Sequence, residues 1–480
     1  MNYRVILQTL GKILCIEAIL LCFPLIVNFI YQENNTLAFL YSMASMIIVG
    51  LPLSLVKVKT KRIFIREGFV IVGLSWIILS LFGALPFVIS QEIPHYIDAL
   101  FETISGFTTT GASILTDVEA MSKSMLAWRS FTHWIGGMGV LVFVLAILPN
   151  SEGQNIYLLK AESTGPQVGK LVSKVRFTAR ILYLIYLGLT LLEFVMLLFG
   201  GNTWYESLVT AFATAGTGGF GIYADSIAGF NVYSQIVVAV FMMIFGINFN
   251  IFFLLIIGKF KQVLKSEEIR WYFGVIVLST VLITVNLVMN MNLTIGTALK
   301  DAYFQVSSII TTTGFATADF NLWPTFSKVI LVILMFIGGC AGSTGGGIKV
   351  SRIVIVFKSL AREIKKLLHP NSISPIKMDG QTLEDDVVKG VNVYFGFIMM
   401  LLFLGTLIVS FDGLDFTSTF TGVIACLNNI GPGLELVGPM GNFDSFSYFS
   451  KVILSLLMLV GRLEIYPILI LFLPKTWSGK

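Results

Sequence analysis

Charged side chains are scarce in this chain of 480 residues. They account for 12% of the sequence and hydrophobic residues for 56%, whereas about 25% of the residues in a soluble domain are charged. Apolar stretches of roughly 20 residues, long enough to cross a hydrocarbon core of about 30 Å, recur along the whole chain. No segment of the size of a soluble domain remains between them. The composition excludes an ordinary globular protein and predicts an all-α polytopic membrane protein.

Histidine and cysteine are also few, which limits the chemistry open to the chain. The histidines are His95, His133 and His369, and the cysteines are Cys15, Cys22, Cys340 and Cys426. They form no nucleophile–base set, no metal-ligand spacing and no disulfide pattern. A phosphate-binding GxxxxGKS or GxxxxGKT motif is absent, and the GSTGGG run at 342–347 follows an apolar helix rather than a strand. The sequence therefore predicts no enzyme active site and no resident cofactor.

The charge that is present follows a pattern of basic clusters separated by loops with few cations and several acids. The clusters are Arg4 and Lys12; Lys57, Lys59, Lys61, Arg62 and Arg66; Lys160, Lys170, Lys174, Arg176 and Arg180; Lys259, Lys261, Lys265 and Arg270; and Lys349, Arg352, Lys358, Arg362, Lys365, Lys366 and Lys377. The acids are Glu33, Glu92, Asp98, Asp117, Glu119, Asp225, Asp319 and Asp412. The positive-inside rule predicts that the basic loops and both termini are cytoplasmic. The basic segments at 160–180 and 349–377 are also candidates for contact with lipid headgroups or a protein.

The apolar spans predict two leading helices followed by four copies of one unit. The leading spans lie near 13–31 and 37–56. Each unit is a span, an external insert and a returning span: 69–90 with 126–148, 181–200 with 233–257, 271–291 with 327–347, and 387–410 with 450–473. An internal repeat decides the architecture of a chain. It divides this one into the leading pair at 1–66 and repeats at 67–150, 151–265, 266–370 and 371–480.

The four inserts align on one glycine each: Gly111, Gly219, Gly314 and Gly431. Thirteen residues before these glycines stand Asp98, Glu206, Asp301 and Ser418, which are residue types that favour a helix N-terminus. About ten helical residues advance only about 15 Å, half of the hydrocarbon thickness. Each insert should therefore enter the membrane as a half-helix and leave it as extended chain, which survives there only if it is buried or lines water. Four such inserts around one axis predict a single pore.

A short tract follows each half-helix, and the four tracts are the candidate filter. They are Thr108, Thr109, Thr110 and Gly111; Gly216, Thr217, Gly218 and Gly219; Thr311, Thr312, Thr313 and Gly314; and Asn428, Asn429, Ile430 and Gly431. A dehydrated cation needs a cage of oxygen dipoles, which rings of backbone carbonyls supply and threonine hydroxyls extend. Glycine allows the positive φ that turns carbonyls toward the axis. The alternative is that these small residues only permit close helix packing. That alternative does not explain why the tracts align at the same position in all four repeats.

Several motifs resemble the TrkH family, the membrane subunits of bacterial Trk potassium transporters. They are TTTGAS, TTTGFATADF, NNIGPG, HWIGGMGVLVF and GGCAGSTGGGIKVSRI. The likeness covers essentially the whole chain, including the leading spans, which the related KtrB subunits lack. The first loop departs from the second and third, with Ala112 where they have Phe220 and Phe315. Only one filter glycine per loop is shared, so modest discrimination among K⁺, Rb⁺ and Na⁺ is expected.

The resemblance implies more than the spacing does. In the wider superfamily, which includes fungal Trk and plant HKT proteins, four loops form the filter, so the tract residues are expected to bind K⁺. The resemblance also implies potassium uptake across the inner (plasma) membrane and a homodimer. It further implies a cytosolic TrkA-type ring that binds NAD(H) or ATP/ADP.

A second candidate site interrupts the returning span of the third repeat. Six of the ten residues in GGCAGSTGGG, at 338–347, are glycine, and each costs about 1 kcal/mol in a helix relative to alanine. With Lys328 at the outer edge of the span, the run lies about 15 Å deep. The helix is expected to break here; the alternative is a flexible cytoplasmic turn.

Arg462 interrupts the last span at the same depth, about 16 Å inward from Lys451. An arginine within a membrane span is a functional candidate by default. We expect it to hydrogen-bond the carbonyls freed by the glycine break, and the resemblance implies an intramembrane gating loop beside this arginine. The predicted gate comprises Gly338, Gly339, Gly342, Ser343, Thr344, Gly345, Gly346, Gly347 and Arg462. The alternative is a snorkelling arginine or one that pairs with Glu464.

A K⁺/H⁺ or K⁺/Na⁺ symporter is the alternative to a channel-like pore. Coupled carriers usually place carboxylates or broken helices near the middle of the membrane. Here the candidate carboxylates are Glu17, Glu193 and Glu464, each near a span end or a basic neighbour.

Overall fold

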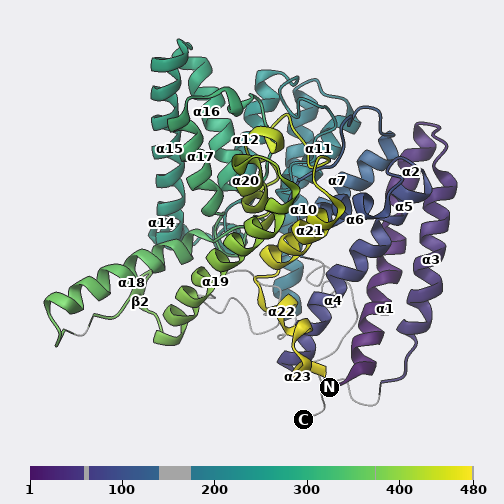
Figure 1. Ribbon diagram of the computed structural model, residues 1–480, viewed down its shortest axis with the longest axis horizontal. Helices are drawn as coiled ribbons and strands as arrows, with labels where there is room; N and C mark the ends of the chain where they lie inside the picture. Colours follow the sequence, from purple (N-terminus) through teal and green to yellow (C-terminus); the bar gives the residue numbers. More distant parts are fainter. Residues whose placement is uncertain (59–63, 140–174, 373, 478–480) are drawn as a thin grey trace.

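The computed structural model of the chain describes residues 1–58, 64–139, 175–372 and 374–477 (Figure 1). These residues form helices and, apart from one isolated bridge, a single two-stranded hairpin. Six helical segments among them are long and apolar enough to cross a membrane, and the bent pair α12–α13 makes up to seven. The predicted all-α polytopic class is confirmed.

The described residues of the leading part and the first repeat, 1–58 and 64–139, form seven helices. They are α1 (Tyr3–Leu20), α2 (Cys22–Ile30), α3 (Thr36–Ser54), α4 (Ile65–Gly83), α5 (Leu85–Ile89), α6 (Tyr96–Phe107) and α7 (Lys123–Gly137). The first span therefore starts earlier than predicted, so Arg4 and Lys12 lie within α1 rather than before it. The end of the expected span at 126–148 and the cations Lys160, Lys170 and Lys174 lie outside the described residues.

The remaining elements continue the predicted order. They are α10 (Val175–Phe199), α11 (Trp204–Gly216), α12 (Val232–Phe245), α13 (Phe249–Ile256), α14 (Phe260–Lys265), α15 (Glu267–Met291), α16 (Ile295–Ile310), η1 (Phe320–Leu322), α17 (Thr325–Phe336), α18 (Val350–Leu368), β1 (Lys377–Met378), β2 (Gln381–Thr382), α19 (Asp385–Val409), η2 (Ser410–Asp412), α20 (Phe416–Leu427), η3 (Glu435–Val437), α21 (Tyr448–Arg462), α22 (Tyr466–Phe472) and α23 (Pro474–Trp477). The strands pair antiparallel across Asp379 and Gly380, both with positive φ, as a two-residue hairpin turn requires.

The outgoing and returning spans of the four repeats differ. The outgoing ones, α4 with α5, α10, α15 and α19, are long and apolar enough to cross a membrane. The returning ones are short or broken: α7 ends at Gly137, α12 and α13 meet at 92°, α17 ends at Phe336, and α21 and α22 are separated at Leu463–Ile465. The spans predicted at 233–257 and 450–473 therefore each contain two helices rather than one.

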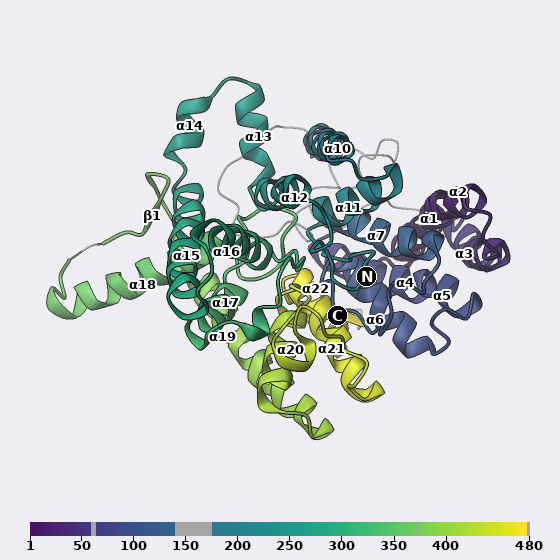
Figure 2. The same ribbon diagram turned by 90° about the horizontal axis from the view of Figure 1, so that it is seen from above.

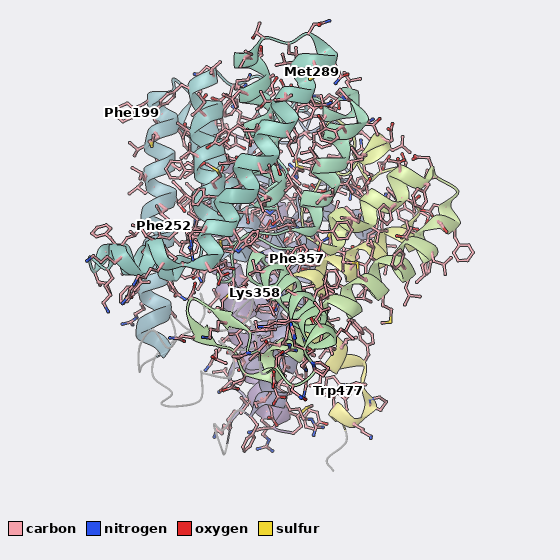
Figure 3. All side chains as sticks on the ribbon, turned by 90° about the vertical axis from the view of Figure 1, so that its left-hand side faces the viewer. Phe199, Phe252, Met289, Phe357, Lys358 and Trp477 are labelled. Atoms are coloured by element: carbon pink, nitrogen blue, oxygen red, sulfur yellow. The ribbon has the colours of Figure 1, made fainter. Side chains whose placement is uncertain are left out.

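Apolar side chains cover the outside of the long helices, as contact with lipid requires. Phe199 at the end of α10 is 80% exposed and Met289 in α15 is 74% exposed, and both extend outward in Figure 3. Viewed from above, the short helices α6, α11, α16 and α20 surround a common centre (Figure 2).

The leading helices α1 and α3 pack through two glycines. A methyl group added to Gly11 would lie 2.6 Å from the carbonyl oxygen of Gly50, and one added to Gly50 would lie 3.0 Å from that of Gly11. Small residues let membrane helices approach this closely.

We expect Gly11→Val to separate α1 from α3 and to lower the free energy of unfolding by about 1–3 kcal/mol, the usual cost of overpacking. The thermal midpoint of the detergent-solubilised protein, followed by gel filtration, measures it. Gly188→Val in α10 is the matched control, because a methyl group added there has no heavy atom of another described segment within 4 Å. Equal midpoints for the two variants would contradict this packing.

Candidate functional site

Four short helices carry the predicted tracts. The helices α6, α11, α16 and α20 have 12, 13, 16 and 12 residues, so they extend about 18 to 24 Å, less than a hydrocarbon core of about 30 Å. Thr203, Thr294 and Asp415 cap three of them with side-chain oxygens that accept backbone N–H groups. A capped start and an early end are what a half-helix needs.

The predicted role of the acids at the helix starts holds for only part of the set. Asp98 and Glu206 lie in the first turns of α6 and α11. Asp301 does not lie at a start, because α16 begins at Ile295 behind its cap Thr294. The prediction for Asp301 is therefore wrong.

The backbone takes the same path in all four tracts. In each tract φ is positive at the glycine and at the residue two positions before it. The glycines Gly111, Gly219, Gly314 and Gly431 have φ of 79°, 75°, 87° and 99°, and Thr109, Thr217, Thr312 and Asn429 have φ of 55°, 53°, 56° and 54°. Non-glycine residues rarely adopt this conformation. The repeated pattern selects Gly219 rather than Gly218 as the equivalent of the other glycines.

The four tracts form a closed ring in chain order. Each glycine lies against the carbonyl group that precedes the glycine of the next tract, so an added methyl group would meet that oxygen. The pairs are Gly111 with Gly218, Gly219 with Thr313, Gly314 with Ile430, and Gly431 with Thr110. The tract residues are buried except for Gly111, Gly219 and Gly314, which are partly exposed. Four backbone segments, each from a different repeat, thus enclose one small region.

The side chains of the tracts are held in different ways. In the first and third tracts the hydroxyl of the first threonine lies 2.8 Å from that of the third, Thr108 with Thr110 and Thr311 with Thr313. In the fourth tract the Asn429 amide donates to Thr110 Oγ1 and to the Met458 carbonyl, both at 2.9 Å. Asn429 therefore joins the last tract to the first and closes the ring with a side chain.

A buried ion pair supports the first tract from behind. Arg129 of α7 donates through Nε to Glu102 of α6 at 2.5 Å, and both side chains are almost completely buried. Glu102 also accepts from Ile114 N and Ser113 Oγ after the tract, each at 3.0 Å. The guanidinium of Arg129 lies 3.6 Å from the centre of the Phe220 ring behind the second tract.

Replacing Glu102 with alanine should cost about 3 kcal/mol of stability, because an unpaired buried charge remains at Arg129. The double variant Glu102→Leu with Arg129→Leu removes both charges and should recover most of the loss. Thermal unfolding of the two variants measures the difference. If Glu102→Ala were as stable as the unmodified protein, the ion pair would not stabilise the fold.

The glycine run breaks the third returning helix where the sequence predicted. The helix α17 ends at Phe336 and α18 begins at Val350. Between them the chain folds back, with a parallel bridge between Ile337 and Ile348 and a 2.8 Å hydrogen bond from Gly338 N to Ile348 O. Most residues of the loop formed by residues 337–349, hereafter the glycine loop, are buried.

The glycine loop touches two of the tracts. Gly346 N donates to Thr312 Oγ1 at 2.6 Å. A methyl group added to Gly345 would lie 2.9 Å from the Thr311 carbonyl oxygen, and one added to Gly346 would lie 2.7 Å from that of Asn428. The absence of side chains at these glycines lets the loop lie directly against the backbone ring.

Arg462 also bonds the glycine loop. Its guanidinium donates to Thr344 O at 2.7 Å and to Gly136 O and Gly137 O at 2.6 and 2.9 Å. Glu464, the acid considered as its partner, instead forms a two-bond pair with Arg352 at 2.9 and 2.5 Å. Arg462 therefore bonds one carbonyl of the glycine break, as expected, and in addition two carbonyls at the end of α7.

The breaks of the four returning helices meet around the glycine loop. The end of α7 reaches the loop through Arg462, at the end of α21. The end of α12 is bonded directly, since Phe245 O accepts from Thr344 Oγ1 at 3.2 Å and Gly246 O from Cys340 N at 2.9 Å. Carbonyls that a helix break leaves free in a membrane must find a partner, and here the breaks satisfy one another.

Three residues of this region were not singled out by sequence reasoning. Lys349 is 1% exposed, and its ammonium group donates to Gly345 O and Gly346 O. Glu268, at the start of α15, accepts from Ala341 N at 2.7 Å and Ser351 N at 3.2 Å. His133 of α7 lies behind the second tract. Lys349 and Glu268 lie in charged clusters of the sequence, and such clusters suggest a protein surface. Only their burial in the structure distinguishes these two residues from surface residues.

The predicted basic surface at 349–377 is wrong for its first two cations. Lys349 and Arg352 are buried, at 1% and 7% exposure, since both cations have partners inside the protein. Neither belongs to a surface that lipid headgroups or a protein can reach, and the exposed cations of α18 begin beyond them.

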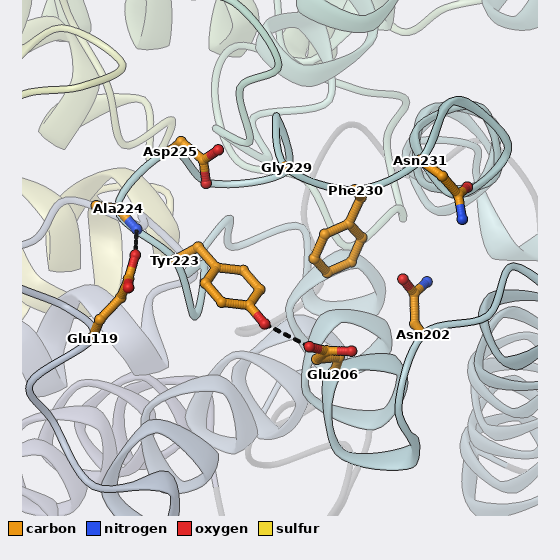
Figure 4. Close-up of a pocket in the computed structure, with 9 residues that line it drawn as sticks. All are labelled: Glu119, Asn202, Glu206, Tyr223, Ala224, Asp225, Gly229, Phe230 and Asn231. Atoms are coloured by element: carbon orange, nitrogen blue, oxygen red, sulfur yellow. Dashed lines mark hydrogen bonds between the residues drawn. The ribbon is translucent and has the colours of Figure 1, made fainter.

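A pocket of about 570 Å³ opens beside the start of α11 (Figure 4). Its lining includes the carboxylates Glu119, Glu206 and Asp225. Tyr223 donates to Glu206 at 2.5 Å, and this bond, together with burial, raises the pKa of Tyr223 to about 12. Three carboxylates around one opening favour the approach of cations.

Comparison with known proteins agrees with this arrangement. A family model described as TrkH, cation transport protein, matches residues 34–479. The chain belongs to the TrkH family. Family members transport cations and are not enzymes, as predicted.

Relatives match over the full length of the chain. The Trk system potassium uptake protein TrkH of Escherichia coli (strain K12) is 36% identical over 485 residues, which cover 99% of this chain and 100% of that protein. The Trk system potassium uptake protein TrkG of the same strain is 31% identical, and the match covers 100% of this chain and 99% of that protein. The crystal structure of the potassium transporter TrkH from Vibrio parahaemolyticus has a TM-score of 0.89 and 32% identity, with both chains covered completely.

Proposed function

We propose that this chain is the potassium-translocating membrane subunit of a Trk system and that K⁺ enters through one pore. The closed ring of four tracts is the observation that carries the proposal. The names of the similar proteins, Trk system potassium uptake proteins, supply the ion. In this proposal the K⁺ ligands come from the same tracts that the sequence predicted, 108–111, 216–219, 311–314 and 428–431.

The proposed filter works through backbone oxygens. K⁺ gives up its hydration shell only where carbonyl dipoles replace it at a suitable spacing. Because each glycine lacks a side chain, the neighbouring carbonyl can approach the ring closely, and the positive φ orients the peptide groups on either side. The half-helices end at the ring, and their negative dipole ends favour a cation there.

The proposed gate is the glycine loop together with Arg462. The loop lies against the third and fourth tracts, and Arg462 ties it to the ends of α7 and α21. A guanidinium beside the pathway opposes a passing cation electrostatically, and the loop fills the space sterically. The described conformation is a closed one in this proposal, and release of the Thr344 contact opens it.

Uptake of radioactive Rb⁺ into vesicles loaded with K⁺ tests the transport proposal. We expect the reconstituted chain to accumulate Rb⁺ and external K⁺ to suppress uptake at lower concentration than external Na⁺. Equal suppression by the two ions would contradict a potassium filter. If uptake requires added cytosolic subunit, the same comparison is made in its presence.

Coupled K⁺/H⁺ or K⁺/Na⁺ transport is the second candidate function, favoured by two buried acids. Glu17 is 1% exposed and Glu193 is not exposed, and both lie in spanning segments. A carboxyl group inside a membrane span is expected to take part in ion or proton transfer. A reversal potential that shifts with the pH gradient would establish coupling, and one that follows K⁺ alone would establish a channel.

The family places the chain in the membrane with several crossings, and we propose the inner membrane with both termini cytoplasmic. We further propose a homodimer and a cytosolic TrkA-type ring that binds NAD(H) or ATP/ADP. The helix α18 extends from the helix body in Figure 1, and its Phe357, Leu360 and Leu367 are 65%, 59% and 83% exposed. These exposed apolar side chains offer a surface for a second copy of the chain.

A further inference from the structure

We propose that His133 positions the second filter tract, which lacks the side chain that the other tracts carry immediately before their glycine. Thr110, Thr313 and Ile430 occupy that position in the first, third and fourth tracts, and Gly218 occupies it in the second. The inference rests on the proposed four-loop filter and deepens it by naming a residue that sets its geometry.

The imidazole of His133 fills the space left by the missing side chain. A methyl group added to Gly218 would overlap ring atoms Cγ, Nδ1 and Cδ2 of His133. A methyl group added to Gly216, at the start of the same tract, would overlap the His133 backbone carbonyl. The second tract therefore uses glycine at two further positions because α7 lies directly behind it.

Two contacts fix the ring in this place. Nδ1 lies 2.7 Å from the Gly106 carbonyl oxygen in α6, and because a carbonyl only accepts, Nδ1 carries the proton. The ring packs on Phe220, with centroids 4.1 Å apart. His133 is completely buried, and its Nε2 has no hydrogen-bond partner among the described residues. The ring thus connects the first half-helix with the second tract through one hydrogen bond and through its volume.

The carbonyl group of Gly218 belongs to the ring formed by the four tracts. Gly218 O is the oxygen that lies against Gly111 of the first tract. Gly218 and Gly219 are adjacent glycines, so the peptide group between them has more conformational freedom than the corresponding group in the other tracts. The imidazole of His133 occupies the space beside Gly218 Cα and restricts the conformations open to Gly218, which keeps this inter-tract contact in place.

The ratio of K⁺ to Na⁺ permeability, obtained from reversal potentials of the full-length protein in bilayers, tests the inference. We expect His133→Ala to lower the ratio by about tenfold, which corresponds to about 1.4 kcal/mol of discrimination. Gly218→Thr should also lower it, because the new side chain collides with the imidazole. The double variant His133→Ala with Gly218→Thr should recover at least part of the loss, since the threonine takes the space of the ring.

Recovery of the permeability ratio in the double variant distinguishes a positioning role from a general loss of packing. If packing alone were lost, the second substitution would lower the ratio further. His369→Ala, at an exposed site after α18, is the control for removal of a histidine. If His133→Ala fails to fold, Gly218→Thr and His133→Phe test the same contact, and the phenylalanine variant should keep a higher ratio than Gly218→Thr.

Gly219→Ser distinguishes failure of this inference from failure of the filter itself. An altered ratio in Gly219→Ser with an unchanged ratio in both His133→Ala and Gly218→Thr would overturn the role of His133 and leave the filter standing. Unchanged ratios in all of these variants would overturn the filter, and the inference with it.

Discussion

Replacing Gly314 with serine is expected to lower the K⁺ to Na⁺ permeability ratio by about tenfold or more, because 1.4 kcal/mol of lost discrimination already gives a factor of ten. Gly314 has φ of 87°, a conformation that costs a residue with a side chain roughly 1–3 kcal/mol. Its added Cβ would also overlap the Ile430 carbonyl oxygen and lie 2.8 Å from Pro432 Cδ. When the backbone shifts to relieve the strained φ and the overlap, a carbonyl group of the ring moves. Reversal potentials measure the resulting change in the permeability ratio.

Gly201→Ser separates the filter effect from backbone strain. Gly201 has φ of 82°, close to that of Gly314, but among the described residues beyond its chain neighbours no heavy atom lies within 4 Å of its added Cβ. The control variant should keep the permeability ratio even if its stability falls by a similar amount. An unchanged ratio in Gly314→Ser would remove the third tract from the filter.

Replacing Arg462 with alanine should raise the open probability of single channels by about a hundredfold or more. The side chain makes three hydrogen bonds to carbonyls of the glycine loop and α7, and each bond from a charged group contributes about 1.5–3 kcal/mol. Loss of even two of them exceeds the roughly 2.7 kcal/mol that a hundredfold shift requires. Single-channel recording at fixed voltage measures the open probability.

Two companion variants make the Arg462 experiment specific. Arg462→Lys keeps the charge but not the fork of donors, so an intermediate open probability is expected. Arg352→Lys weakens the pair with Glu464 at similar burial and should change stability more than gating. An open probability in Arg462→Ala equal to that of the unmodified chain would exclude Arg462 from the gate.

The architecture could be predicted from the sequence because hydrophobic length and repetition are local signals. The span lengths predict membrane crossings without knowledge of any contact, and one glycine per insert sets the register that the φ values repeat. The glycine run predicts its own helix break, since no other residue loses as much in a helix except proline. These features depend on neighbours in the chain rather than on neighbours in space.

The breaks in the other returning helices were missed for the opposite reason. The helices α12 and α13 together are apolar enough for one span, so the single Gly246 and the cap at Asn248 are weak signals of a break. The 92° bend there is stabilised by Cys340 N and Thr344, which lie far away in the sequence. His133 was judged a scattered histidine, because the absent side chain at Gly218 is informative only when the tracts are superimposed. Long-range contacts of this kind leave no periodic trace in the sequence.

The central claim is that the four tracts bind K⁺ as one site. A crystal of the protein grown with Rb⁺ tests it most directly, because the anomalous scattering of rubidium locates the ion without reference to activity. We predict a peak enclosed by the four tracts, within coordination distance of carbonyl oxygens from more than one of them. Rubidium bound only elsewhere along the pathway, with the region between the tracts empty, would contradict the account.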